Sequence, residues 1–351
     1  MRPGAQAART ARGGALNARD DKQDGLRAEV SAYCARVGTD PLLVQGAGGN
    51  ASWKNGDTMW VKASGTWLAE AQRTNIFVPV DLAHLRAAIA AGDMEVVPRA
   101  LAGSALRPSI ETLMHALMPQ TVVMHLHAVE ILAHLVRPDF AGPAPAPAPW
   151  CWVDYHKPGA ALAGAIVARL REQPEAQIIF LQNHGVVIGG ADVGEVETIL
   201  TSLLACMRTE PVAPVAPTGA EASTMAKLTA ISDEGIQQLA LDPRLYKRLR
   251  KEWTLCPDHV VFLGAEAACY ADAESFVAAQ TMGDEARLAI IAGVGVYVAG
   301  DFGAARTAQL RCYYDILARQ PSDAPLTTLT PPQLAELLDW DAERYRLAMA
   351  R

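Results

Sequence analysis

The stretch Thr121-Val122-Val123-Met124-His125-Leu126-His127 decides how this chain is interpreted. Its β-branched and apolar residues predict a strand, in which side chains two residues apart point to the same face. His125 and His127 are therefore expected to project together. Imidazole is the commonest neutral ligand for zinc and other divalent transition metals, so the pair predicts two ligands of one metal ion. An isolated His-x-His is equally consistent with two structural histidines at a strand end, and the surrounding sequence decides between these readings.

A glycine-rich loop and a hairpin precede this strand. The loop is Gln45-Gly46-Ala47-Gly48-Gly49-Asn50. Residues 51–54 and 58–62 flank Asn55-Gly56-Asp57, and Asn-Gly between two β-rich segments is typical of a tight hairpin turn. The sequence therefore predicts that the loop leads directly into an antiparallel pair of strands.

Two further segments before the histidine pair carry cap signals. Pro79 is expected to end a short strand, and Asp81 to cap the helix that follows. Ser109 is placed as the N-cap of a helix over residues 110–117, which puts Glu111 in its first turn. An acid in a first helical turn complements the helix dipole, so Glu111 alone would not indicate catalysis.

A third histidine lies in a second β-rich segment downstream. Asn183-His184-Gly185 separates predicted strands at 177–181 and 186–188, and a long helix is expected over 192–207. The pattern predicts a tight turn that places His184 at the end of a strand pair.

The later part of the chain contains an apparent echo of the earlier part. Residues 286–317 repeat the strand, glycine turn, strand and helix order of residues 177–206, without the histidine. The segment Pro-Asp-His-Val-Val-Phe at 257–262 resembles the strand at 122–124 in the same way. Either this half is a degenerate partial copy of the first, or short strand-glycine-helix patterns recur by chance.

These patterns divide the chain of 351 residues into four parts. An Ala-, Arg- and Gly-rich start is expected to be a disordered leader, and a proline-rich stretch is expected to be a linker between two domains. The predicted boundaries are 1–22 for the leader, 23–209 for the metal-binding domain, 210–222 for the linker and 223–351 for a C-terminal α/β domain of unknown role.

Composition narrows the class of protein. Half of the residues are hydrophobic and 20% are charged, as in globular proteins with a sizeable core, and the net charge of −7 argues against a nucleic-acid partner. Six cysteines occur without a Cys-x-x-Cys motif, and no segment reads as a signal peptide or a membrane span. A cytoplasmic protein with reduced thiols, a small-molecule substrate and no membrane partner is expected.

The motifs, taken in order, resemble those of the class II aldolase/adducin family over residues 25–207. The resemblance implies an α/β fold, a three-layer αβα sandwich with a central, mainly antiparallel sheet, to which this chain adds a smaller C-terminal α/β domain. It also implies a homo-oligomer, usually a tetramer. The motifs that carry it are Gly46-Ala47-Gly48-Gly49-Asn50, Lys62-Ala63-Ser64-Gly65, Pro108-Ser109-Ile110-Glu111, His125-Leu126-His127 and Asn183-His184-Gly185.

The resemblance implies a site as well as a fold. The family's metal ligands fall on His125, His127 and His184, its metal is normally Zn²⁺ or another divalent transition metal, and its acid/base carboxylate falls on Glu111. Three neutral imidazoles leave an open position for the hydroxyl and carbonyl oxygens of a substrate, and a nearby carboxylate can move the proton. His115, four residues after Glu111, is expected to have a packing or supporting role.

Relatives that act on phosphorylated sugars hold the phosphate with short donors. The corresponding residues here are Gly48, Gly49, Asn50, Ser64, Gly65 and Ser109. Ala47 and Ile110 stand where those relatives have hydroxyl side chains. Three interpretations remain open at this stage: Lys62 or Arg107 compensates, the substrate anion is a carboxylate, or the substrate carries no anion.

The activity implied is that of a zinc-dependent aldolase, a carbon-carbon lyase that cleaves a sugar phosphate or related sugar acid through a metal-stabilised enediolate. An epimerase, decarboxylase or dehydratase of the same family would keep the same histidines, whereas a non-catalytic adducin-like interaction module would not need them. The chain also resembles the first part of larger bacterial proteins in which an aldolase half is fused to a dehydrogenase. No Gly-x-Gly-x-x-Gly follows a strand in residues 223–351, so no nucleotide cofactor is expected.

Overall fold

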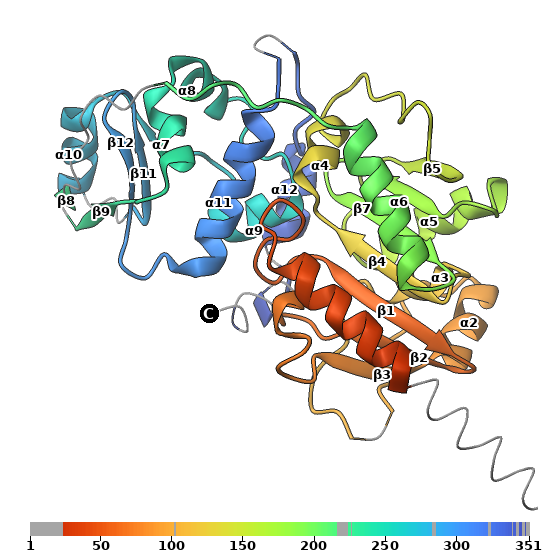
Figure 1. Cartoon of the computed structure of the whole chain (residues 1–351). Helices are drawn as coiled ribbons and strands as arrows, with labels where there is room; N and C mark the ends of the chain where they lie inside the picture. The colour runs from red at the N-terminus through yellow and green to blue at the C-terminus, as the bar shows by residue number, and fades with distance from the viewer. Residues whose placement is uncertain are drawn as a thin grey trace, which may run out of the picture.

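A computed structural model gives the structure of residues 24–101, 103–215, 224–225, 227–282, 286–321, 324–338, 340–341, 344–345 and 348. The predicted leader, residues 1–22, lies outside these residues, as does the predicted linker from residue 216 onward. The described chain forms one seven-stranded and one five-stranded sheet, each covered by helices (Figure 1).

The larger sheet has the strand order β3-β2-β1-β4-β7-β6-β5 and is antiparallel except between β5 and β6. The predicted hairpin joins β1 and β2, and Gly56 in its turn has a φ of 58°, which glycine adopts without steric cost. The strands are β1 Asn50–Asn55, β2 Thr58–Lys62, β3 Phe77–Asp81, β4 Val122–Leu126, β5 Trp150–Val153, β6 Ile178–Leu181 and β7 Gly185–Gly190.

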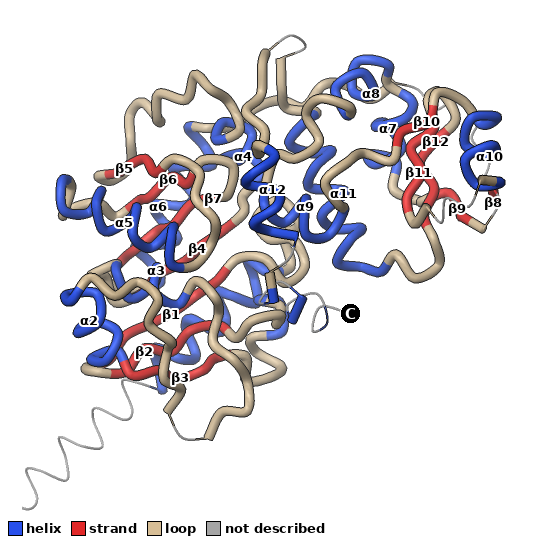
Figure 2. Tube along the Cα trace, turned by 180° about the vertical axis from the view of Figure 1, so that it is seen from behind, coloured by secondary structure: helices blue, strands red, loops and turns tan. Residues whose placement is uncertain are grey.

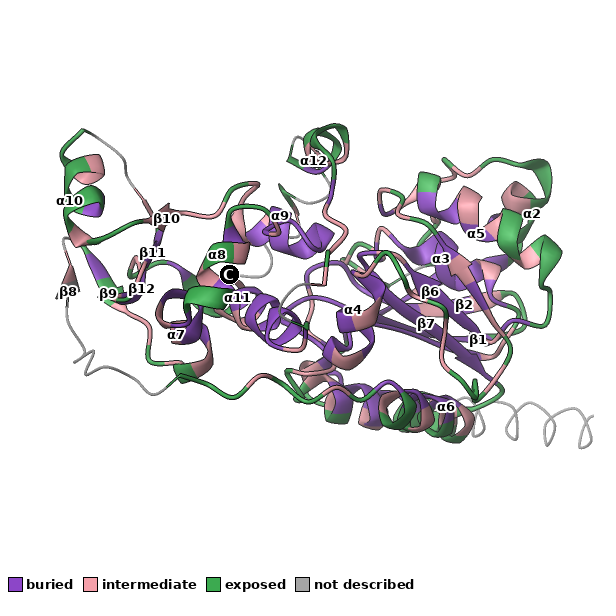
Figure 3. Ribbon diagram, turned by 90° about the horizontal axis from the view of Figure 1, so that it is seen from above, coloured by how far each residue is buried: buried purple, intermediate pink, exposed green. Residues whose placement is uncertain are grey.

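Helices cover both faces of this sheet, which gives the predicted αβα sandwich. The first helix, over residues 24–38, and α6 pack on one face, whereas α2, α3 and α5 pack on the other (Figures 1 and 2). The strands are buried, and the outer surfaces of the covering helices are exposed (Figure 3). The labelled helices of this part are η1 Leu68–Glu70, α2 Leu82–Ala91, α3 Thr112–Leu117, α4 Val129–Leu135, α5 Ala160–Glu172 and α6 Val193–Cys206.

The alternation of side chains along β4 decides which helix layer the histidines meet. Val122, Met124 and Leu126 join the core beneath α6, whereas Val123 joins the core on the opposite face. His125 has the same parity as Val123 and therefore points toward the layer that contains α3. The helix that follows Glu111 is α3, so the fold brings the carboxylate and the imidazole together.

The second half forms a smaller α/β unit around the sheet β10-β11-β12-β9-β8. Helices α7 and α11 pack on one face of this sheet, and α10 packs on the other. Its elements are β8 Thr224–Met225, β9 Leu228–Ala230, α7 Glu234–Leu241, α8 Pro243–Leu249, α9 Pro257–Leu263, β10 Cys269–Tyr270, α10 Ala273–Thr281, β11 Leu288–Ile291, β12 Gly295–Val298, α11 Gly303–Leu317 and α12 Pro331–Leu338.

The two sheets share a topology. The order β8-β9-β12-β11-β10 matches β1-β4-β7-β6-β5, and in each the last two strands are the parallel pair. The segment 286–317 has the strand, turn, strand and helix order of 177–206. Residues 257–262, however, are part of helix α9 rather than an echo of β4; Pro257 occupies the first turn, a position that favours proline because no helical donor is lost there.

Three local predictions need correction. Pro79 lies inside β3 instead of ending it, because β3 is an edge strand of the sheet and proline is tolerated there. Helix α3 begins at Thr112 rather than at Ile110, and Glu111 occupies its N-cap position. The strand β5, Trp150–Val153, follows the proline-rich segment of residues 141–149 and was not predicted.

Asp81 caps α2 as predicted, since its side chain accepts a hydrogen bond from the backbone N–H of His84. Within the described part of the chain, no helix has the length and apolarity that crossing a membrane requires.

Candidate metal centre

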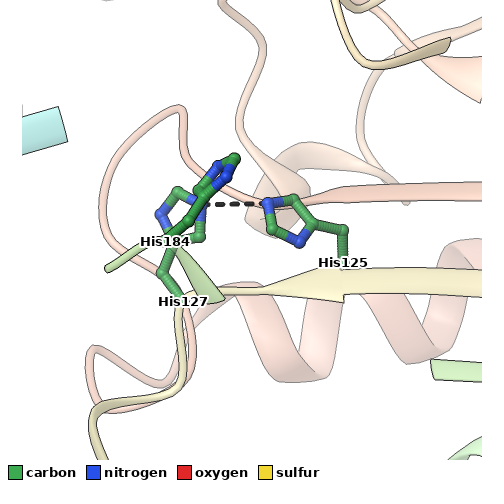
Figure 4. Close-up of side chains that lie close together, drawn as sticks. All are labelled: His125, His127 and His184. Atoms are coloured by element: carbon green, nitrogen blue, oxygen red, sulfur yellow. Dashed lines mark hydrogen bonds between the residues drawn. The ribbon is translucent and has the colours of Figure 1, made fainter. Parts of the chain in front are cut away.

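Three histidines meet at one end of the larger sheet (Figure 4). His125 lies in β4, His127 directly follows that strand, and His184 lies in the turn between β6 and β7. Each ring offers one nitrogen as a ligand atom, and these three nitrogens lie within 4.8 Å of one another. All three side chains are buried.

The orientation of His125 is set by the neighbouring strand. Its Nδ1 lies 3.1 Å from the carbonyl oxygen of Val186, which only accepts hydrogen bonds, so Nδ1 carries the proton. Burial lowers the pKa of His125 well below its ordinary value, and the ring is therefore neutral. Its Nε2 keeps a free lone pair and faces Nε2 of His127 at 3.1 Å.

Glu111 lies beside two of these rings. Its Oε1 is 3.2 Å from Nε2 of His184 and its Oε2 is 3.7 Å from Nε2 of His125, while Asn50 donates a hydrogen bond of 2.6 Å to Oε2. Burial raises the pKa of Glu111, but the electrostatic influence of His125 and of the adjacent His184 together hold the pKa below its usual range. Glu111 is thus an ionised carboxylate at the histidine cluster.

The donor set fits a divalent transition metal. Zinc with Zn–N bonds of about 2.0–2.1 Å in a tetrahedral arrangement holds its ligand nitrogens about 3.3 Å apart, close to the 3.1 Å between His125 and His127. Oε1 of Glu111 and Nδ1 of His184 are buried without a hydrogen-bond partner among the described residues. A buried carboxylate oxygen with no hydrogen bond is costly, and a cation beside it would offset that cost.

A polar pocket adjoins the histidines. Five of the six expected anion-binding residues, Gly49, Asn50, Ser64, Gly65 and Ser109, line it together with Glu111, His127 and His184, whereas Gly48 does not. Its free volume is about 20 Å³, enough for a water molecule. The remaining lining residues are Ala47, Lys62, Ile110, Pro158 and Asp258.

Lys62 is the cation of this pocket. Its side chain is buried, and its Nζ donates a hydrogen bond of 3.1 Å to the carbonyl oxygen of Ala47 in the glycine-rich loop. Arg107, the other residue considered for this role, does not line the pocket; it lies under the ring of Tyr345, 4.6 Å from the ring centroid.

Two glycines leave the space that the imidazole rings occupy. A Cβ on Gly48 would lie 3.1 Å from Nδ1 of His127, and one on Gly185 would lie 3.1 Å from both Cε1 of His125 and Cδ2 of His127. The Cβ on Gly185 would also approach the carbonyl oxygen of Leu126 to 2.5 Å. The glycine-rich loop and the turn after His184 therefore pack directly against the cluster, which is why small residues are needed there.

His115 lies beneath the site without reaching it. Its Nδ1 is 2.8 Å from Oγ of Ser52, and burial lowers the pKa of His115 to about 3, so the ring is neutral. His115 is fully buried and does not line the pocket, in keeping with the expected supporting role.

Two residues at the site were not predicted. Asp258 at the start of α9 places Oδ2 3.3 Å from Nδ1 of His127, and Gln309 of α11 donates a hydrogen bond of 3.2 Å to the same oxygen. Both come from the second half, more than 130 positions beyond His127 in the chain. No local pattern marks them, because the contact depends on how the two halves pack.

The chain matches a known family. The model of the Class II Aldolase and Adducin N-terminal domain family matches residues 28–210. The chain is 29% identical over 177 residues to the uncharacterized oxidoreductase YuxG of Bacillus subtilis (strain 168); the match covers 44% of this chain and 25% of that protein. The match thus spans about a quarter of that curated relative's length.

Three solved structures illustrate what the chain is similar to. The N-terminal class II aldolase domain of a conserved protein from Thermoplasma acidophilum is 23% identical with a TM-score of 0.40, and the match covers 51% of this chain and 89% of that chain. YgbL, a putative aldolase/epimerase/decarboxylase from Klebsiella pneumoniae, is 20% identical with a TM-score of 0.42, and the match covers 53% of this chain and 87% of that chain. L-fuculose-1-phosphate aldolase from Thermus thermophilus is 18% identical with a TM-score of 0.36, and the match covers 52% of this chain and 91% of that chain.

The family model covers more than half of the chain, including every motif from the glycine-rich loop to the His184 turn. This chain belongs to the class II aldolase and adducin family.

Proposed function

We propose that this protein is a metal-dependent aldehyde-lyase that cleaves a carbon-carbon bond in a sugar phosphate or related sugar acid. The observation that carries the proposal is the buried cluster of His125, His127 and His184 with the carboxylate of Glu111 3.2 Å from the last of them. A divalent cation held there, Zn²⁺ or another transition metal, would supply Lewis-acid stabilisation of the negative charge that develops on the substrate oxygens.

The protein's own groups supply the rest of the chemistry. Glu111 is ionised and held by Asn50, so it is set to accept a proton from the substrate hydroxyl and to return one to the carbon left after cleavage. The charged side chains of the pocket are buried, which strengthens each electrostatic contact between them.

The anionic end of the substrate is assigned to the opposite wall of the pocket. Ser64, Gly65 and Ser109 offer backbone N–H groups and hydroxyls, and Lys62 offers a positive charge. Ser109 Oγ already accepts a hydrogen bond of 3.2 Å from the Glu111 N–H, which leaves its own hydrogen free to donate. Lys62 can offset the donors missing at Ala47 and Ile110, and this supports an anionic substrate.

Several finer assignments belong to the same proposal. Zinc is the metal assigned, the assembly is a homotetramer, and the location is the cytoplasm, where six free cysteines would remain reduced. The division into a metal-binding domain at 23–209, a linker at 210–222 and a C-terminal domain at 223–351 is also a proposal, and the shared topology of the two sheets supports reading the second as a degenerate partial copy.

The test begins with metal content per chain in the purified, untagged protein, followed by NMR of mixtures with ketose 1-phosphates and 3-oxo sugar acids in D₂O. One bound transition metal per chain and release of an aldehyde support the lyase. Inversion of a hydroxyl, loss of CO₂ or loss of water without aldehyde would instead identify an epimerase, a decarboxylase or a dehydratase. A chain that takes up no zinc would favour a non-catalytic, adducin-like module.

A further inference from the structure

We propose that Asp258, from the second half of the chain, is a positioning residue of the metal centre that holds His127 with Nδ1–H toward the carboxylate and Nε2 toward the metal. The inference rests on the metal site of the proposed function. It assigns the second half a part in that site.

The contact is buried and close. Oδ2 of Asp258 lies 3.3 Å from Nδ1 of His127, and the two residues are 5% and 6% exposed. An ionised carboxylate only accepts hydrogen bonds, so a neutral imidazole facing it at Nδ1 carries its proton there. The other nitrogen, Nε2, is then unprotonated, and it is the one that faces Nε2 of His125 at 3.1 Å.

His125 has a similar but uncharged partner at its Nδ1, a backbone carbonyl. The carbonyl of Val186 fixes the tautomer of His125, as the carboxylate of Asp258 does for His127. A ligand imidazole that faces a carboxylate is also a stronger donor to the metal, and loss of such a partner typically weakens metal affinity about 10- to 100-fold.

Asp258 is itself held in place by contacts that cross between the two halves. Gln309 Nε2 donates to Oδ2 of Asp258 at 3.2 Å and also lies 3.4 Å from the carbonyl oxygen of Gln45. Gln45 Nε2 in turn donates to the carbonyl oxygen of His127 at 3.3 Å. These bonds join α9, α11 and the glycine-rich loop around His127.

The surroundings leave the pair little room to rearrange. A Cβ on Gly48 would lie 3.1 Å from Nδ1 of His127 and 3.3 Å from Oδ2 of Asp258, so a side chain at this position would press against both. Behind the site, Asn183 Nδ2 donates to the carbonyl oxygens of Leu255 and Thr327 at 2.8 and 2.7 Å. The turn that carries His184 is therefore also bonded to the second half.

A purely structural role for Asp258 makes a different prediction. Asp258 lies in the first turn of α9, where an acid complements the helix dipole. That role would account for an effect of substitution on stability, but it gives no reason for a change in zinc affinity of the folded protein or in the tautomer of His127.

The test measures the zinc dissociation constant of the full-length apoprotein by competition with a chelating dye. The variants are Asp258→Asn and Asp258→Ala, with Asp315→Asn as the matched control, because Asp315 is an equally buried carboxylate that pairs with Arg311 and Arg319 instead of a histidine. We expect zinc to bind about 10- to 100-fold more weakly to Asp258→Ala, less so to Asp258→Asn, and unchanged to Asp315→Asn.

A measurement on the unmutated protein stands beside the variants. In zinc-loaded protein with ¹⁵N-labelled histidine, the His127 ring should show a protonated Nδ1 and a metal-bound Nε2. Wild-type affinity in both Asp258 variants, or a metal-bound Nδ1 in His127, would overturn the inference and leave the metal site standing. Failure of the wild type to bind zinc would overturn the proposed function as well. If neither variant folds, the tautomer measurement alone decides.

Discussion

Replacing Glu111 by Gln tests the acid/base assignment with little change of shape. The amide oxygen of Gln can accept the bond that Asn50 now donates to Oε2, so the side chain should keep its place. Its NH₂ then occupies the Oε1 position, 3.2 Å from Nε2 of His184, and no group there can take up a proton. The variant should fold and retain metal, yet lose the proton transfer.

The expected magnitude follows from that loss. A positioned acid/base group contributes about 10²- to 10⁴-fold to rate, equivalent to roughly 3–5 kcal/mol of transition-state stabilisation. We expect kcat to fall by such a factor while metal content per chain stays the same. The assay measures aldehyde release from whichever ketose 1-phosphate or 3-oxo sugar acid proves to be the substrate. It also measures deuterium uptake at the carbon next to the carbonyl.

The matched control is Glu130→Gln. Glu130 is a partly buried carboxylate that pairs with Arg319 and Thr209 rather than with the histidines. This variant should lose stability without losing turnover. If Glu111→Gln kept more than about a tenth of wild-type kcat with metal bound, the loss would be far below that of a general base, and the role assigned to Glu111 would be refuted.

Four further outcomes are expected. Saturating zinc at about 100 times its dissociation constant should raise the Tm of the apoprotein by about 4–7 °C in calorimetry, and His125→Ala should abolish the rise. Gly185→Ala should weaken zinc binding at least about tenfold in dye competition, because the added Cβ would collide with Leu126 and crowd two ligand rings. The control is Gly164→Ala in a helix, where the nearest atom to the added Cβ would be 3.9 Å away, and it should leave zinc affinity unchanged. Lys62→Met should raise KM for an anionic substrate roughly tenfold with a smaller effect on kcat, and an unchanged KM would remove Lys62 from the anion site. Burial lowers the pKa of Lys54 to about 7, so above that pH the folded protein binds fewer protons than the unfolded chain. The free energy of unfolding, measured with urea, should therefore rise by about 2 kcal/mol from pH 7 to pH 9. Lys54→Met should flatten this slope.

Local chemistry explains which parts of the fold were predictable. The Asn55-Gly56 turn, the Asp81 cap and the strand with His125 each depend on residues within a few positions of one another. A period of two put both histidines on one side, although His127 lies just past the end of β4. Such features need no knowledge of the rest of the molecule.

The errors arise where tertiary context overrides a local rule. Proline ends a strand where its missing N–H would have to donate a hydrogen bond to a neighbouring strand. Pro79 lies in the edge strand β3, where that donor is not required. Ser109 was expected to cap the helix directly, but its hydroxyl accepts from the Glu111 N–H in a turn that precedes α3. Asp258 reaches His127 only through the packing of the two halves, which no spacing in the sequence encodes.

Strand pairing shows what became of the ligand positions in the second sheet. His125 pairs with Val187, two residues after the Gly185 that begins β7, and Ala230 pairs with Tyr297, two residues after the Gly295 that begins β12. Ser232 follows Ala230 by two residues, as His127 follows His125, so Ser232 occupies the position of His127. Val294 precedes Gly295, as His184 precedes Gly185, so Val294 occupies the position of His184.

On the proposal that the second half is a degenerate copy, all three ligand positions have therefore lost their imidazoles. The copy would nevertheless have kept a function at the first site, because its α9 and α11 carry Asp258 and Gln309 to His127. Selection on such a copy would act on the packing between the halves rather than on its own former ligands. The zinc affinity of the first site would then be the quantity that measures what the second half contributes.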